Sequence, residues 1–254
     1  MPRAHRKQSR TAPSGYFAWE AAGLRWLRVA GGADVVEVLD EGAHHLDLAD
    51  LVEARPNAQL AEALGRGLAV THAAGAPGFG SGPQGWSGDG WLGPLHEPLP
   101  LPLGSWPSWG QLLAARIEPL VRLGRARAVL GPADATLLDR FAASVAGGRF
   151  DTGEAPARLH GDLWSGNVLW TAEAAVLIDP AAHGGHREAD LAMLALFGCP
   201  HLERVLAAYD EAAPLAEGWR ERVLLHQVHP LLVHAVLFGG SYPAQAVGAA
   251  RRYL

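Results

Sequence analysis

The 254-residue sequence has a single cysteine, Cys199, and no long hydrophobic run. One cysteine cannot form a disulfide within the chain, so the composition is typical of a reducing compartment and predicts a cytoplasmic protein. The longest uncharged stretches, 67–87 and 223–250, are interrupted by glycine, proline or histidine, so we expect no membrane span. The basic N-terminal residues lack the apolar core of a secretory signal.

Lysine is almost absent as well. Lys7 is the only lysine, and the other basic residues among the 21 are all arginine. Acidic residues number 26, which gives a net charge of −5, so no global positive charge attracts nucleic acid or an anionic membrane and we expect neither as a partner. A lone lysine among arginines reflects either chance or a position that requires a compact ammonium.

Hydrophobic spacing predicts a small mixed α/β part followed by a larger helical part. Helical spacing covers 16–29 and 57–72, short β-prone runs cover 35–39 and 46–52, and residues 6–8 do not resemble a strand. Residues 75–110 are rich in proline and glycine and contain four tryptophans, which predicts an irregular insertion packed onto the rest. Further helices are predicted over 111–123, 133–145, 188–196, 202–209, 218–238 and 243–253, and a β-hairpin at 168–170 and 175–178.

The polar residues of segment 159–190 have the spacing that phosphoryl transfer needs. Asp162 and Asn167 lie on one predicted loop, and Asp179 ends the second strand of the hairpin. In kinases one Asp accepts the proton of the attacking hydroxyl, while an Asn five residues later and a second Asp hold Mg²⁺ at the ATP phosphates. A second interpretation is a metal-hydrolase site, although it leaves Asn167 without a role; its ligands would be His160, Asp162, Asp179, His183 and His186.

The chain resembles the fructosamine kinase, or ketosamine-3-kinase, family. The resemblance rests chiefly on His160-Gly-Asp-Leu-Trp-Ser-Gly-Asn167, Ile178-Asp-Pro-Ala and Gly185-His-Arg-Glu-Ala-Asp190-Leu-Ala. It implies an α+β, protein-kinase-like fold of two lobes. The small α/β lobe, residues 1–54, is expected to be truncated at its N-terminus and to lack the glycine-rich hairpin. The larger lobe, residues 55–254, is mostly helical and carries the insertion 75–110.

The resemblance also implies roles for individual residues. Asp162 would be the catalytic base, and Asn167 and Asp179 would hold Mg²⁺. His160 and Asp190 would support the catalytic loop, Asp190 through backbone amides; a plain helix N-terminal carboxylate is the alternative for Asp190.

The remaining roles that the resemblance implies concern the binding of ATP and of the sugar-derived acceptor. Lys7 would contact the ATP phosphates and pair with Glu20; the alternative for Lys7 is a solvated residue in a basic tail. ATP would bind near Asp50 and Val52. Trp164 would either stack on the sugar of the substrate or pack in the core.

The resulting hypothesis is an ATP- and Mg²⁺-dependent kinase that phosphorylates a hydroxyl of a small-molecule ketoamine or glycated amine. Two alternatives remain at this point. One is a kinase of another small polar hydroxyl compound, such as an aminoglycoside or choline. The other is a kinase-like module that binds nucleotide without catalysis, which the missing hairpin would favour. The sequence does not indicate an oligomeric state.

Overall fold

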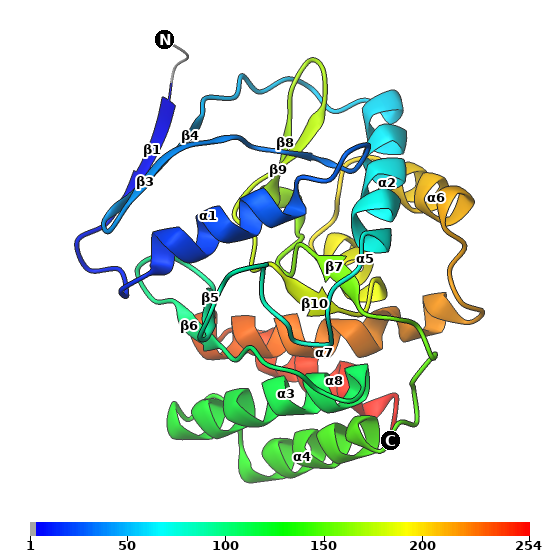
Figure 1. The fold of residues 1–254 in the computed structure, drawn as a ribbon. Helices are drawn as coiled ribbons and strands as arrows, with labels where there is room; N and C mark the ends of the chain where they lie inside the picture. The colour runs from blue at the N-terminus through cyan, green and yellow to red at the C-terminus, as the bar shows by residue number, and fades with distance from the viewer. Residues whose placement is uncertain (1–3) are drawn as a thin grey trace.

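The computed structural model describes residues 4–254, which form two lobes (Figure 1). The small lobe holds an antiparallel sheet in the order β1-β4-β3, with helix α1 against it. Leu46 and Leu48 of the central strand pack with Phe17 and Leu24 of the helix in one buried cluster. The elements are β1 (Ala4–Gln8), α1 (Tyr16–Leu27), β3 (Val38–Gly42) and β4 (His45–Ala49).

Strand β1 corrects the expectation that residues 6–8 would not form a strand. It pairs antiparallel with β4, and Lys7 lies opposite Leu46. Most side chains of β1 are exposed, so its sequence is polar and carries no apolar alternation that could reveal a strand. The hydrogen-bond ladder to the apolar strand β4 holds β1 in place, and this is a tertiary effect that local propensity does not contain.

The large lobe is mostly helical, and its helices begin and end within a few residues of the predicted positions. In Figure 1, α3, α4, α7 and α8 form the end of the molecule opposite the small-lobe sheet. Their apolar faces share the largest hydrophobic cluster of the protein. The helices are α2 (Ala58–Ala73), α3 (Trp109–Ala126), α4 (Pro132–Ala146), α5 (Glu188–Leu196), α6 (Leu202–Ala212), α7 (Trp219–Phe238) and α8 (Tyr242–Arg251).

Short strands lie between the two lobes. The predicted hairpin forms as β8 (Val168–Trp170) and β9 (Ala175–Leu177), and β9 also pairs in parallel with β2 (Asp34–Val35). The predicted β-run 35–39 is therefore divided, because residues 34–35 join β9 while β3 starts only at Val38. Strands β7 (Ala157–Leu159) and β10 (His183–Gly185) form a separate antiparallel pair. These strands position the loops that face the small lobe.

The tryptophan-rich insertion is more ordered than its composition suggests. It contains a hairpin of β5 (Gly90–Leu92) and β6 (Leu99–Leu101). The indole nitrogen of Trp19 in α1 donates a hydrogen bond of 3.1 Å to the carbonyl of Trp91, and the rings of Trp19 and Trp86 are 5.4 Å apart. The insertion therefore packs onto the small lobe, as expected, but with regular β-structure.

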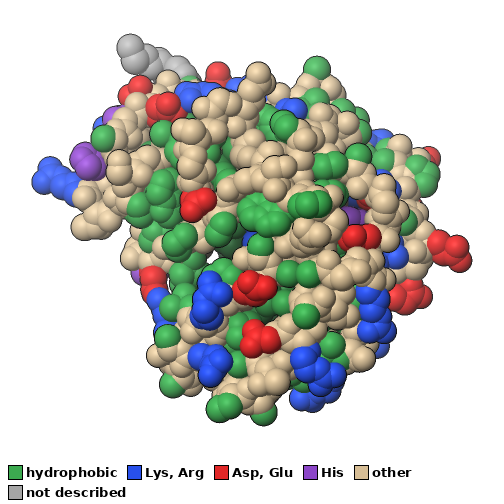
Figure 2. All heavy atoms as spheres, turned by 60° about the horizontal axis from the view of Figure 1, so that its bottom comes forward, with side chains coloured by type: hydrophobic (Ala, Val, Ile, Leu, Met, Phe, Trp, Pro, Cys, Tyr) green, Lys and Arg blue, Asp and Glu red, His purple; other side chains and the backbone are tan. Residues whose placement is uncertain are grey.

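Within residues 4–254, no helix combines the length and the apolar character needed to cross a membrane. Figure 2 shows the face formed largely by the helical end of the molecule, where basic and acidic side chains are interspersed. No patch of one charge sign dominates that face.

Candidate active site

The loop between β7 and β8 carries Asp162 and Asn167. The Asn167 side chain is buried, and its amide nitrogen donates to the Asp162 backbone carbonyl at 2.7 Å and lies 3.3 Å from the Asp162 carboxylate. Asp179 follows β9, and the Asn167 amide also reaches its carbonyl at 3.4 Å. Asp179 has a φ of 53°, a left-handed conformation that Asp adopts more readily than most residues. The structure thus brings these three residues together.

Asp190 holds the start of this loop. Its two carboxylate oxygens accept hydrogen bonds from the backbone amides of His160, at 2.7 Å, and Gly161, at 2.9 Å. Gly161 has a φ of +80°, and a β-carbon at this position would clash with the carbonyl of Ala181, so only glycine fits. His160 adds a side-chain contact of 2.8 Å to the Ile178 carbonyl. Burial opposes the charge on Asp190, but His72 and the loop amide outweigh it and lower its pKa.

Lys7 extends from β1 to the same place. Its Nζ contacts both carboxylate oxygens of Glu20, at 2.7 and 2.8 Å, and Oδ1 of Asp179 at 3.0 Å. The Lys7 side chain is only 17% exposed, so it is not a solvated tail residue. Burial opposes its charge, but the two carboxylates outweigh burial and raise its pKa. The amine therefore stays protonated and bridges the small lobe to the end of β9.

The Asp162 carboxyl lies in an environment that favours its neutral form. Burial is the main cause, and the nearby carboxylates of Asp179 and Asp190 add to it. The hydrogen bond from Asn167 opposes them, and the net result raises the pKa of Asp162 from 3.8 to about 7. A carboxyl with a pKa near the working pH can accept a proton and release it again, which suits a general base.

The arrangement also fits a magnesium ion. Glu20 and Asp179 both contact the Lys7 ammonium, so the three groups together carry one net negative charge when both carboxylates are ionised. Within the described chain, Oδ1 of Asn167 and Oδ2 of Asp179 accept no hydrogen bond. Free carboxylate and amide oxygens are the hard donors that Mg²⁺ prefers. Asn167 and Asp179 could therefore hold the ion.

Asp162 borders two hollows. One is a cleft of about 290 Å³ between the lobes, also lined by Lys7, Glu20, Asn167 and Asp179. The other is a cavity of about 70 Å³ inside the large lobe, whose lining includes residues of α3, β10, α5 and α7. The Asp162 carboxylate thus lies where the charged cleft and the inner cavity adjoin.

Trp164 lies at the cleft and not in the core. Its side chain is 39% exposed and lines the cleft, and its ring meets Phe197 edge-on at 6.0 Å. Gly166 lies directly beneath the indole, where a β-carbon would clash with the ring. Core packing is therefore the weaker of the two interpretations for Trp164.

Two residues predicted to lie near ATP are apart from this cluster. Asp50 and Val52 follow β4 and are exposed, Val52 by 82%, and neither lines the cleft described above. Their role stays a prediction. Sequence reasoning missed Tyr16, which lines the cleft, and His72, which lies 3.2 Å from the Asp190 carboxylate. His72 lies 118 residues from Asp190 in the chain, and no local motif marks it.

The histidine-rich metal-hydrolase site does not form. The rings of His160 and His183 form hydrogen bonds with backbone carbonyls, and the ring of His183 also contacts Arg116. Among the residues described, two groups could bring three ligand atoms together, and neither contains Asp162 or Asp179; they are His186, Glu188, His226 and Asp40, His45, Asp47.

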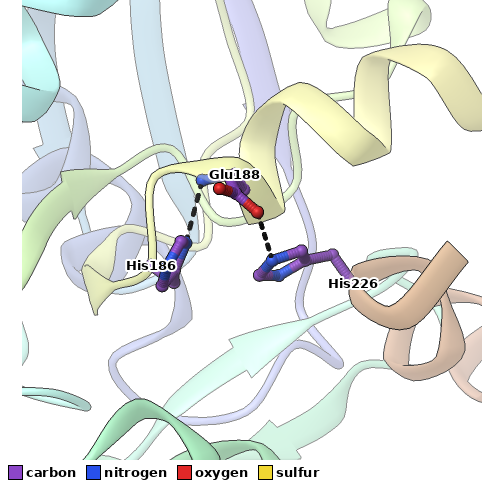
Figure 3. A group of neighbouring side chains, drawn as sticks. All are labelled: His186, Glu188 and His226. Carbon is purple, nitrogen blue, oxygen red and sulfur yellow. Dashed lines mark hydrogen bonds and ion pairs between the residues drawn. The ribbon is translucent and has the colours of Figure 1, made fainter. Parts of the chain in front are cut away.

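The first of these groups is shown in Figure 3. The His226 ring contacts the Glu188 carboxylate at 3.2 Å, and the Glu188 amide points to the ring of His186 at 3.3 Å. Arg222 occupies both carboxylate oxygens of Glu188, at 2.6 and 2.9 Å. Burial opposes the charge, but His226 and Arg222 lower the pKa of Glu188 to about 2. This is a buried ion-pair network, and its carboxylate is already neutralised without a metal.

Comparisons with known proteins give relatives of the chain as a whole. The "Probable ketoamine kinase" of Synechocystis sp. is 36% identical over 187 residues, which are 72% of this chain and 58% of that protein. A crystal structure of a "putative fructosamine-3-kinase" from Thermobifida fusca superposes with a TM-score of 0.89 at 46% identity, over 98% of this chain and 85% of that one.

A more distant likeness concerns the fold alone. The streptomycin–ATP–APH(2")-IIa ternary complex superposes with a TM-score of 0.63 at 11% identity, over 98% of this chain and 84% of that one. The α+β architecture is therefore the kinase-like fold of the aminoglycoside phosphotransferases. The sequence profile described as Fructosamine kinase matches residues 5–254. With nearly the whole chain matched, this protein belongs to the fructosamine kinase family.

Proposed function

We propose that this protein transfers the γ-phosphoryl group of ATP to a hydroxyl of a sugar-derived ketoamine, as in the removal of glycation from proteins or metabolites. The observation that carries the proposal is the position of Asp162 between the charged cleft and the inner cavity. A base at this position can take a proton from a hydroxyl that faces the γ-phosphate of ATP bound in the cleft.

Each residue of the cluster has a part in this reaction. Lys7, held by Glu20 and Asp179, would contact the phosphates as a point charge. Asn167 and Asp179 would hold Mg²⁺, which neutralises phosphate charge when bound. Asp162 would accept the proton while the acceptor oxygen bonds to the γ-phosphorus and the bond to the ADP oxygen breaks. Asp190 would keep the loop in position through its two amide contacts.

The names of the relatives support a ketoamine acceptor. The Synechocystis protein carries the name "Probable ketoamine kinase" and the Thermobifida protein the name "putative fructosamine-3-kinase". The exposed face of Trp164 beside Asp162 supports a sugar ring as the group that enters. The shortened small lobe and the division at residue 54 stay predictions, and the order of the small-lobe sheet is compatible with either a short or a longer lobe.

The test is ADP release with ATP and Mg²⁺, measured with fructosylglycine, choline or an aminoglycoside as acceptor. We expect turnover with fructosylglycine and a product that has gained one phosphoryl group by mass spectrometry. Turnover with choline or the aminoglycoside alone would support a different small-molecule kinase. Nucleotide binding with no turnover on any acceptor would support a non-catalytic module and contradict the proposal.

A further inference from the structure

Arg116, in the middle of α3, is a buried cation without an acidic partner. Its side chain is 7% exposed, and no carboxylate of the described residues forms an ion pair with it. Burial lowers the pKa of Arg116 to about 9, so the guanidinium is still charged at neutral pH. Burying an unpaired charge is unfavourable, and such charges are normally compensated by a partner of opposite charge.

The one contact of the guanidinium leaves its other edge buried without a hydrogen-bond partner. Nη1 lies 2.6 Å from Nε2 of His183, whose Nδ1 lies 2.7 Å from the Ala181 carbonyl. Nδ1 must therefore carry the proton, and Nε2 accepts from Arg116. Burial and the charge of Arg116 lower the pKa of His183 to about 3, so the ring is neutral and does not compensate the cation. Nε and Nη2 of Arg116 have no partner.

The unpartnered edge has the geometry of an anion-binding fork. Nε–H and Nη2–H of a guanidinium point in parallel, and this pair of donors matches the two oxygens of a carboxylate. A lysine could not provide this fork. The unpaired nitrogens are thus the two that a bidentate carboxylate would occupy.

The position of the fork relates it to Asp162. Arg116 lines the same inner cavity as Asp162, and the volume of about 70 Å³ is sufficient for a small polar group. Arg116 also borders a neighbouring cavity of about 120 Å³, lined mainly by leucine and proline. Asp190, the other acidic residue of the inner cavity, is occupied by loop amides. No acidic side chain of either lining therefore serves as the counter-ion of Arg116.

We propose that Arg116 binds the carboxylate of the acceptor, so that the preferred substrates are ketoamines of free amino acids with the carboxylate next to the glycated nitrogen. The proposal rests on the function proposed above and names the substrate class for the same site. The acceptor carboxylate would then occupy the small cavity at Arg116, and the sugar-derived part would lie in the cleft with its hydroxyl at Asp162. Arg116 is a specificity residue in this scheme and takes no part in proton transfer.

The experiment compares two acceptors that differ only in charge, α-N-fructosylglycine and its amide, α-N-fructosylglycinamide. Binding is measured by calorimetry without nucleotide, and kcat/KM is measured with ATP and Mg²⁺. We expect the protein to prefer the acid by roughly ten- to a hundred-fold, as for a charged hydrogen-bonded pair. Arg116→Gln should remove this preference. Arg122→Gln, an exposed arginine of the same helix, should keep it.

Equal binding of acid and amide by the unaltered protein would overturn the proposal. So would a preference that survives Arg116→Gln. Stabilisation by inorganic phosphate, with no preference between the two ketoamines, would overturn it in favour of a phosphate site. The comparison on the unaltered protein needs no variant, so a poorly folding Arg116→Gln leaves the test intact. If the acid binds preferentially but no ketoamine is phosphorylated, the proposed function fails while the carboxylate site stands.

Discussion

Replacing Asp162 with asparagine should abolish phosphoryl transfer and at the same time stabilise the protein at neutral pH. Asparagine has nearly the shape of aspartate but cannot accept the proton, and a positioned base contributes roughly 10²–10⁴-fold to the rate. Stability should change in the opposite direction, because the folded protein disfavours the ionised form of this carboxyl. The variant removes that cost.

The size and the sign of this stability change follow from the pKa of Asp162. The folded protein holds the proton up to about pH 7, whereas an ordinary aspartate loses it near 3.8. Between these values the unfolded chain binds fewer protons, so the stability of the unaltered protein falls as the pH rises. The full difference corresponds to about 4 kcal/mol, and partial solvent exposure of Asp162 reduces it to about 2 kcal/mol. The advantage of the variant should therefore grow from pH 4 to pH 7 and stay constant above.

Thermal unfolding at pH 5 and pH 8 measures the stability difference between Asp162→Asn and the unaltered protein. A gain of about 2 kcal/mol raises the Tm of a chain of this size by roughly 4–8 °C. We expect about a third of the full gain at pH 5. Asp139→Asn, at an exposed position on α4, is the matched control and should show no pH-dependent gain. An Asp162→Asn gain that is the same at both pH values would refute the reasoning about burial, and near-normal ADP release would refute the role of base.

Three further changes test the rest of the cluster. Asp179→Ala should weaken Mg²⁺-dependent ATP binding more than Asp162→Asn does, since it removes a metal oxygen; an unchanged Mg²⁺ titration of the folded variant would remove Asp179 from the site. Lys7→Ala should lower the Tm by several degrees because it leaves the Glu20 carboxylate buried without a partner, and adding Glu20→Gln should recover most of that loss while ATP affinity stays reduced. Trp164→Ala should raise the KM for a ketoamine about tenfold with little change in ATP affinity or Tm, and a lower Tm with an unchanged KM would return Trp164 to a packing role.

The sequence could predict the catalytic loop and the helices because their signals are local. Asp162, Asn167 and Asp179 lie within 18 consecutive residues, and the hairpin of apolar runs between Asn167 and Asp179 brings the two ends close. The helices carry their own apolar faces and, at Asn57 and Ser108, their own caps.

What could not be predicted depends on contacts between distant segments. Strand β1 exists because β4 pairs with it, and its own residues show no strand pattern. Arg116 in α3 lies 67 residues from His183, and neither residue alone predicts their buried contact. The alternation of β5 and β6 is hidden among prolines and glycines. In each case the stabilising partner lies elsewhere in the chain, where local propensity carries no information.

The isolation of Lys7 has a chemical consequence for a protein proposed to act on glycated amines. Sugars condense with unprotonated amines, since only the free electron pair of nitrogen attacks an aldehyde. The sole ε-amine of this chain is held by Glu20 and Asp179, which raise its pKa and keep it protonated. No second lysine exists to take its place, because arginine supplies every other basic side chain. The protein therefore offers reducing sugars no reactive lysine, and it is protected from lysine glycation, the same kind of damage that its proposed substrates carry.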